Sequence, residues 1–110
     1  MHDTPIVIYR PGQTPEQRNV PRPYGVRAIT DVVGPLLGGA DVDHVPVVYH
    51  GAWRDLFIDP LADMRGLDRN EMATAIYQNY MLSKFPDTDP ETVPFIRGIA
   101  VLFPRERVWI

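Results

Sequence analysis

The residue types best suited to holding a small ligand gather at the start of the chain. Residues 1–30 contain four arginines against one aspartate and one glutamate, a formal charge of +2, whereas the whole chain carries −3. Guanidinium groups bind phosphates, and aromatic rings stack on nucleobases. This composition predicts a nucleotide site whose candidate residues are Arg10, Arg22, Arg27 and Tyr24. The alternative is a proline-rich surface loop whose arginines keep the protein soluble.

Aromatic side chains further along the chain define a second hypothesis, a protein-binding surface. The candidate interface residues are Trp53, Tyr49 and Trp109. Aromatic residues in strands usually belong to the core or to a half-buried face. Trp53 follows the short connection that begins at His50 and Gly51, so an exposed Trp53 at the hairpin tip would act as an interface anchor.

Four residues near position 44 have side chains that divalent cations accept as ligands: Asp41, Asp43, His44 and His50. Successive side chains of a strand point to opposite faces, and neither the HxxxH nor the HExxH spacing occurs in this chain. We therefore expect a solvated loop that leads into a strand, with no metal site and no cofactor.

The remaining polar residues do not form a recognisable catalytic motif. Asp55 and Asp59 lie four residues apart on one strand, about 13 Å along it, which is too far for paired-carboxylate hydrolysis. The single serine, Ser83, lies in a predicted helix without a nucleophile elbow. We therefore expect no enzyme activity. A pocket in which His44 or His50 meets a carboxylate within hydrogen-bond reach would favour an enzyme.

The elements that must position these residues are clearest between positions 45 and 85. Two runs alternate in polarity with a period of two, which predicts a hairpin of strands 45–49 and 54–58. Asp68 and Glu71 have the spacing of a capping box, and apolar residues then recur at helical spacing until Pro86. These features predict a helix with Asp68 as its N-cap.

The rest of the chain supplies strands at 5–9, 17–20 and 95–103, a last edge strand at 105–110, and a helix that begins near residue 24 and is kinked at Gly34 and Pro35. The segment 95–103 is apolar on both of its alternating faces, as an interior strand requires. We predict one α+β domain over residues 1–110. Its order is ββαββαβ, with two helices on one face of a small mixed or antiparallel sheet.

The composition sets further limits. At 110 residues, with 45% hydrophobic and 23% charged residues, the chain has the values of one globular domain. It has no cysteine, and no apolar run approaches the roughly 18 residues of a membrane span. We therefore expect a cytoplasmic protein without a membrane partner. The net charge is too small to predict nucleic-acid binding.

The run GLDRNEMAT at residues 66–74, followed by FIRGIAVL at 95–102, resembles a domain-of-unknown-function family of small actinobacterial and actinobacteriophage proteins. The family pattern is Gly-Leu-x-x-Asn-x-x-Ala-Thr. The resemblance implies a small intracellular protein without an established activity. Within the motif we expect Asn70 to fasten the preceding loop, Ala73 to permit close helix–sheet approach, and Thr74 to bond back within the helix.

Together these patterns predict a non-enzymatic, phage-encoded accessory protein that acts by binding a host protein or by self-association. Strands expected at both ends of the chain supply free edges for such pairing. The alternative function is a protein that binds or sequesters a nucleotide.

Overall fold

The computed structural model describes residues 3–21, 25–38 and 41–104, with the backbone alone for residues 3, 21 and 25–30. The described elements are β1 (Asp3–Tyr9), β2 (Glu16–Pro21), α1 (Gly25–Leu37), β3 (Asp43–Tyr49), β4 (Ala52–Ile58), α2 (Glu71–Lys84), a short 3-10 turn η1 (Pro90–Thr92) and β5 (Ala100–Pro104). The α+β class and the order ββαββαβ are confirmed.

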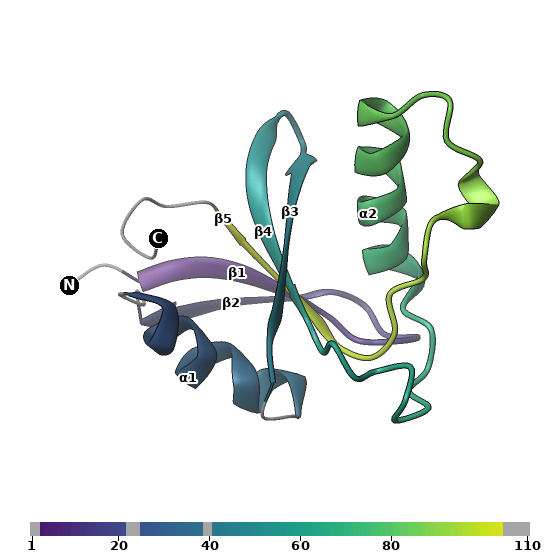
Figure 1. Ribbon diagram of the computed structural model, residues 1–110. Helices are drawn as coiled ribbons and strands as arrows, with labels where there is room; N and C mark the ends of the chain where they lie inside the picture. The colour runs from purple at the N-terminus through teal and green to yellow at the C-terminus, as the bar shows by residue number, and fades with distance from the viewer. Residues whose placement is uncertain (1–2, 22–24, 39–40, 105–110) are drawn as a thin grey trace.

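The five described strands form one antiparallel sheet in the order β2-β1-β5-β4-β3 (Figure 1). The last strand, β5, is inserted between two hairpins, so it joins β1–β2 to β3–β4. The edges of the sheet are therefore β2 and β3, and the strands nearest the chain ends, β1 and β5, are interior. The edge strand expected at 105–110 lies outside the described residues.

The two helices lie on opposite faces of the sheet, which corrects the expectation of one shared face. Val101 and Phe103 of β5 belong to the core cluster that includes Val33 and Leu37 of α1. Ala100 and Leu102 belong to the cluster that includes Ala73 and Ile76 of α2. Because β5 is buried and apolar on both faces, each face needs a covering helix.

A two-residue turn joins β3 to β4. His50 has φ 51° and Gly51 has φ 75°, the two positive values that a type I′ hairpin turn requires. The pairing of Tyr49 with Ala52 therefore closes the hairpin directly at the turn. The hairpin extends beside α2, which packs mainly against β3 (Figure 1).

The helix α2 is capped by Asn70, so the prediction of Asp68 as the N-cap is wrong. The Asn70 side-chain oxygen accepts from the Ala73 N–H at 3.1 Å, and its amide group donates to the carbonyls of Tyr9 and Gly98, both at 2.8 Å. A carboxylate at this place would cap the helix but donate to neither carbonyl. Asp68 is exposed instead.

The other two residues expected to act in this motif also face the segment before β5. Ala73 is fully buried in the core beneath α2, as close approach requires. The Thr74 hydroxyl accepts from the Ile96 N–H at 2.9 Å and lies 3.3 Å from the Ile96 carbonyl. Thr74 therefore bonds across to the segment before β5 and not within its own helix.

Candidate functional site

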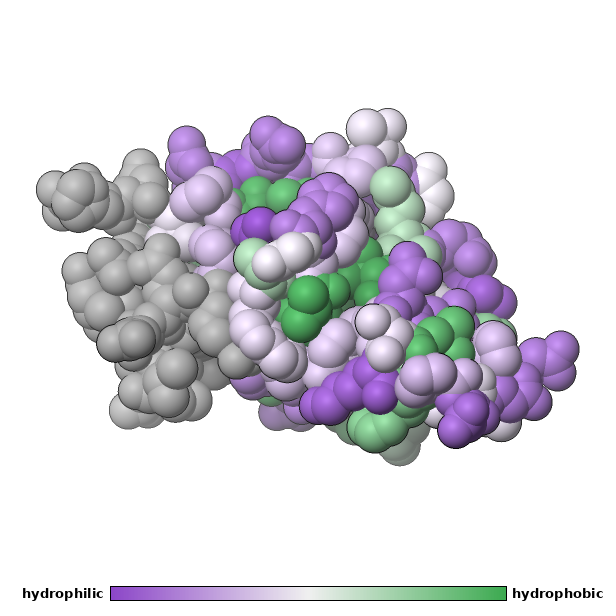
Figure 2. Space-filling view, turned by 90° about the horizontal axis from the view of Figure 1, so that it is seen from above, coloured by the Kyte–Doolittle hydropathy of each residue, from purple (hydrophilic) through white to green (hydrophobic). Residues whose placement is uncertain are grey.

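The largest of the described hollows is a groove between the β3–β4 hairpin and the second half of α2. We call it the hairpin–helix groove. Its volume is about 510 Å³, within the range of ligand-binding sites in proteins. Figure 2 looks down on the hairpin tip and the end of α2 and shows hydrophobic surface in the middle of this face. The groove is lined by Val48, Trp53, Asn79, Tyr80, Ser83 and Lys84.

The spacing of these residues follows from the two elements that carry them. Asn79 and Ser83, and likewise Tyr80 and Lys84, are four residues apart, so all four lie on one face of α2 over two turns. On the hairpin, Val48 lies directly opposite Trp53. The rings of Trp53 and Tyr80 meet edge to face at 5.8 Å between centroids. The groove thus has an aromatic wall from each element.

Two apolar side chains of the groove remain open to solvent: Trp53 is 46% exposed and Val48 is 41% exposed. The one charged residue among the six is Lys84, whose ammonium donates to the Tyr80 hydroxyl at 3.2 Å. No described carboxylate pairs with Lys84. The groove therefore offers apolar contact area beside a cation, with an amide and a hydroxyl on the same helical face.

Of the other two predicted interface residues, Tyr49 does not line the groove. Tyr49 is half-buried against the core beneath α2, and its ring stacks on His50 with centroids 3.9 Å apart. The buried Tyr9 faces the same side, and burial together with Tyr49 raises the pKa of Tyr9 to about 12. Trp109 lies outside the described residues. Of the two that the structure describes, Trp53 lines the groove and Tyr49 does not.

The predicted nucleotide site is described only at Arg10. Arg22 and Tyr24 lie outside the described residues, and Arg27 is described in its backbone alone. Arg10 forms a 2.7 Å ion pair with Glu16, and hydrogen bonds from Arg10 and Arg18 lower the pKa of the Glu16 carboxyl. Arg10 also lines a hollow of about 430 Å³ between the β1–β2 turn and the start of α2. Glu16 offsets this charge in part, because the same carboxylate also pairs with Arg18 at 2.5 Å.

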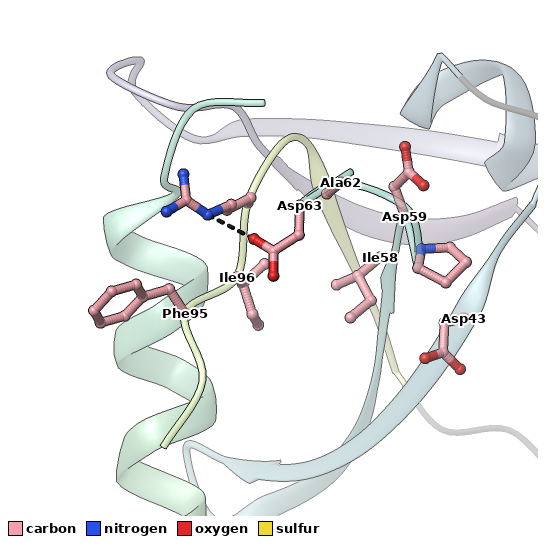
Figure 3. Close-up of a pocket in the computed structure, with 9 residues that line it drawn as sticks. Asp43, Ile58, Asp59, Ala62, Asp63, Phe95 and Ile96 are labelled. Carbon is pink, nitrogen blue, oxygen red and sulfur yellow. Dashed lines mark ion pairs between the residues drawn. The ribbon is translucent and has the colours of Figure 1, made fainter. Parts of the chain in front are cut away.

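A third hollow, of about 160 Å³, lies where β3 and β4 meet the loop before α2 (Figure 3). Three of its lining residues are acids, but each has its own partner. Asp63 pairs with Arg97 at 2.8 Å, Asp59 pairs with Arg65, and Asp43 accepts from a backbone N–H. The three carboxylates point in different directions in Figure 3. Among the described residues no acidic or histidine cluster is suited to a metal ion.

One histidine meets a carboxylate. The His44 Nε2 atom lies 2.6 Å from an Asp55 oxygen, and the His44 ring packs on Phe57 with centroids 5.3 Å apart. Asp55 has only 3% of its side chain exposed, whereas His44 has 49%. A buried carboxylate that orients an exposed imidazole is the arrangement of a general base. However, His44 lines none of the three hollows.

The hairpin register explains why this pair did not emerge from the sequence. A four-residue connection, as expected there, would place Asp55 opposite Val48, four residues from His44. The two-residue turn places Asp55 opposite Pro46, two residues from His44 on the same face of the sheet.

Comparison with protein-family models, with curated proteins and with solved structures finds no significant match. The resemblance to the actinobacterial and phage family therefore stays a prediction. In the part of the chain that the structure describes, neither helix is long and apolar enough to cross a membrane.

Proposed function

We propose that this protein is a non-enzymatic interaction module that binds a partner protein through the hairpin–helix groove. The observation that carries the proposal is the pair of exposed apolar side chains, Trp53 and Val48, placed opposite Tyr80 in a groove of about 510 Å³. Tryptophan and tyrosine are the residue types most often found as binding hot spots. Leaving them exposed is unfavourable in water, and a partner that covers them removes that cost.

The groove gives the proposed interaction a different basis from the free strand edges that the sequence suggested. We expected strands near the chain ends to supply free edges. Among the described strands β2 is an edge, whereas β1 and β5 are interior, and the strand expected at 105–110 lies outside the described residues. Binding through side chains of the groove does not depend on such edges. On the resemblance alone, we further propose that the partner is a host protein or a second copy of a phage-encoded chain, met in the bacterial cytoplasm.

A second candidate function is an enzyme that uses His44 as a general base. The observation that favours it is the 2.6 Å contact between His44 and the buried Asp55. We rank it second because His44 lines none of the three hollows described above. The single serine, Ser83, lines the hairpin–helix groove and does not lie with His44. The nucleotide-binding alternative stays a prediction, and the ion pair of Arg10 with Glu16 does not favour it.

The substitution Trp53→Ala tests the proposed function. Removing the indole takes away the largest exposed apolar surface of the groove, so capture of a partner from bacterial lysate should fall about tenfold or more. The matched control is Met64→Ala, since Met64 is 85% exposed and does not line the groove. Capture should stay unchanged in the control.

Self-association needs its own measurement. If the partner is a second copy, light scattering at rising protein concentration should show that the wild type associates more strongly than the Trp53→Ala variant. Circular dichroism of both variants checks that the fold is kept. Equal capture and equal oligomeric state for the wild type and the Trp53→Ala variant would contradict the proposal.

A further inference from the structure

The free edge of β3 is protected over most of its length. In an antiparallel ladder alternate pairs are not hydrogen-bonded, and the two-residue turn makes Tyr49 and Ala52 a hydrogen-bonded pair. The main-chain groups of Val48, Pro46 and His44 therefore point away from β4. Pro46 has no N–H, and the His44 N–H donates to the Asp43 carboxylate at 2.8 Å. A long strand cannot pair along this edge.

Of these three positions, Val48 alone has an outward N–H that is neither absent, as in proline, nor bonded to the Asp43 carboxylate, and Val48 lines the groove. Val48 directs both its N–H and its carbonyl outward, and its side chain lines the groove with Trp53. A short extended segment can thus bond to Val48 while it places one side chain against Trp53 and Tyr80. The volume of about 510 Å³ accommodates a few residues of such a segment.

The charge of the groove is one-sided. Lys84 donates to the Tyr80 hydroxyl, and its ammonium lies 5.7 Å from the centre of the Tyr80 ring and 5.8 Å from that of Phe85. An ammonium has three N–H donors, so two remain for a ligand. The residues that line the groove include no acid. An anionic group of a partner therefore finds a complementary charge at Lys84.

We propose that the hairpin–helix groove binds a short extended acidic peptide of the partner, with a large apolar side chain against Trp53 and Val48 and an Asp or Glu carboxylate on Lys84. This inference rests on the proposed function and names the partner's chemistry. The Val48 N–H fixes the backbone of the peptide beside β3. The protected edge at Pro46 and His44 limits the bound segment to a few residues.

The test uses short acetylated and amidated peptides that carry an uncharged fluorescent dye, and it follows anisotropy with the full chain. The first probe has the core Gly-Phe-Asp-Glu-Gly, the second replaces the two acids by Asn and Gln, and the third replaces Phe by Ala. The acidic Phe peptide should bind about fivefold more tightly than its neutral analogue, the size expected of an exposed ion pair. That ratio should approach one in 1 M salt. The Ala peptide should lose most of its affinity.

Two variants test whether Lys84 supplies the positive charge that binds the acidic peptide. Lys84→Met should reduce the acidic peptide to the affinity of the neutral one. Arg18→Met, on the opposite edge strand β2, should leave the ratio unchanged. Amide exchange at Val48 should slow in the presence of the acidic peptide.

Several results would overturn the inference. Equal affinities for the acidic and neutral peptides would show that the groove does not recognise the negative charge. Equal losses of affinity in Lys84→Met and Arg18→Met would show that the attraction comes from the general charge of the protein and not from Lys84. If no peptide binds although partner capture depends on Trp53, the peptide inference fails and the proposed function stands. If capture does not depend on Trp53, the proposed function itself fails.

Discussion

At the scale of single residues, Asn70 holds together segments that are far apart in the chain. Its amide donates to carbonyls that lie 61 and 28 residues away, at Tyr9 and Gly98, and its own N–H donates to the Ile96 carbonyl at 2.8 Å. The same side chain caps α2. Asn70 is 2% exposed, so these groups have no water to replace a lost bond.

The substitution Asn70→Ala should therefore destabilise the protein strongly. It removes the cap, which is worth about 1 kcal/mol, and leaves two buried carbonyls without this donor at about 1 kcal/mol each, so we expect a loss of about 3 kcal/mol. Asp68→Ala removes an exposed side chain and should cost less than about 0.5 kcal/mol. Urea unfolding measures both values.

Asn70→Asp separates the two roles of this residue. It keeps an oxygen for the cap but turns a carboxylate toward two carbonyls, so its cost should at least equal that of Asn70→Ala. A mild effect for Asn70→Asp would show that Asn70 is only a helix cap.

The sequence predicted the existence and order of the elements because each has a local signal. The polarity of the hairpin strands, the stop at Pro86 and the apolar run before Pro104 all act over a few residues. Asn70 was not recognised as the cap because the spacing of Asp68 and Glu71 fits a capping box equally well. The deciding carbonyls of Tyr9 and Gly98 come close only in the folded chain.

At the scale of elements, the hairpin and α2 lie side by side and form the groove, and the edge of β3 cannot pair with a long strand. The sequence did carry one signal that α1 and α2 cover opposite faces, namely a β5 segment apolar on both sides. Of the residues that line the groove, the sequence predicted only Trp53 as part of a binding surface. Its depth depends on the distance between α2 and β3, which no local pattern sets.

Pro46 is the residue that should keep β3 from pairing with a second copy. The substitution Pro46→Thr restores an outward N–H on this edge, so association should increase with protein concentration. Light scattering measures the change. The control is Pro60→Thr in the exposed loop after β4, which should leave the protein unchanged. A Pro46→Thr variant with the wild-type oligomeric state at millimolar concentration would contradict this role.

At the scale of the whole molecule, the two ends of the sheet differ in how their side chains are buried and bonded. The end of the sheet near Asn70 is fixed by buried hydrogen bonds, whereas the end with the hairpin tip exposes Trp53, Val48 and Lys84. Rigid support on one side and open apolar surface on the other is what a binding module requires. The function proposed for the chain depends on that open end.

Hydrogen exchange of the bound protein tests most directly whether the chain binds its partner through the hairpin–helix groove. With the partner captured by the wild-type chain, or with the chain at a concentration where it self-associates, amide exchange is compared with that of the free monomer. The account predicts slower exchange at residues 47–54 and 79–85, with little change at residues 10–18. Slower exchange confined to residues 10–18 and the start of α2, or none around Val48 and Trp53, would contradict it.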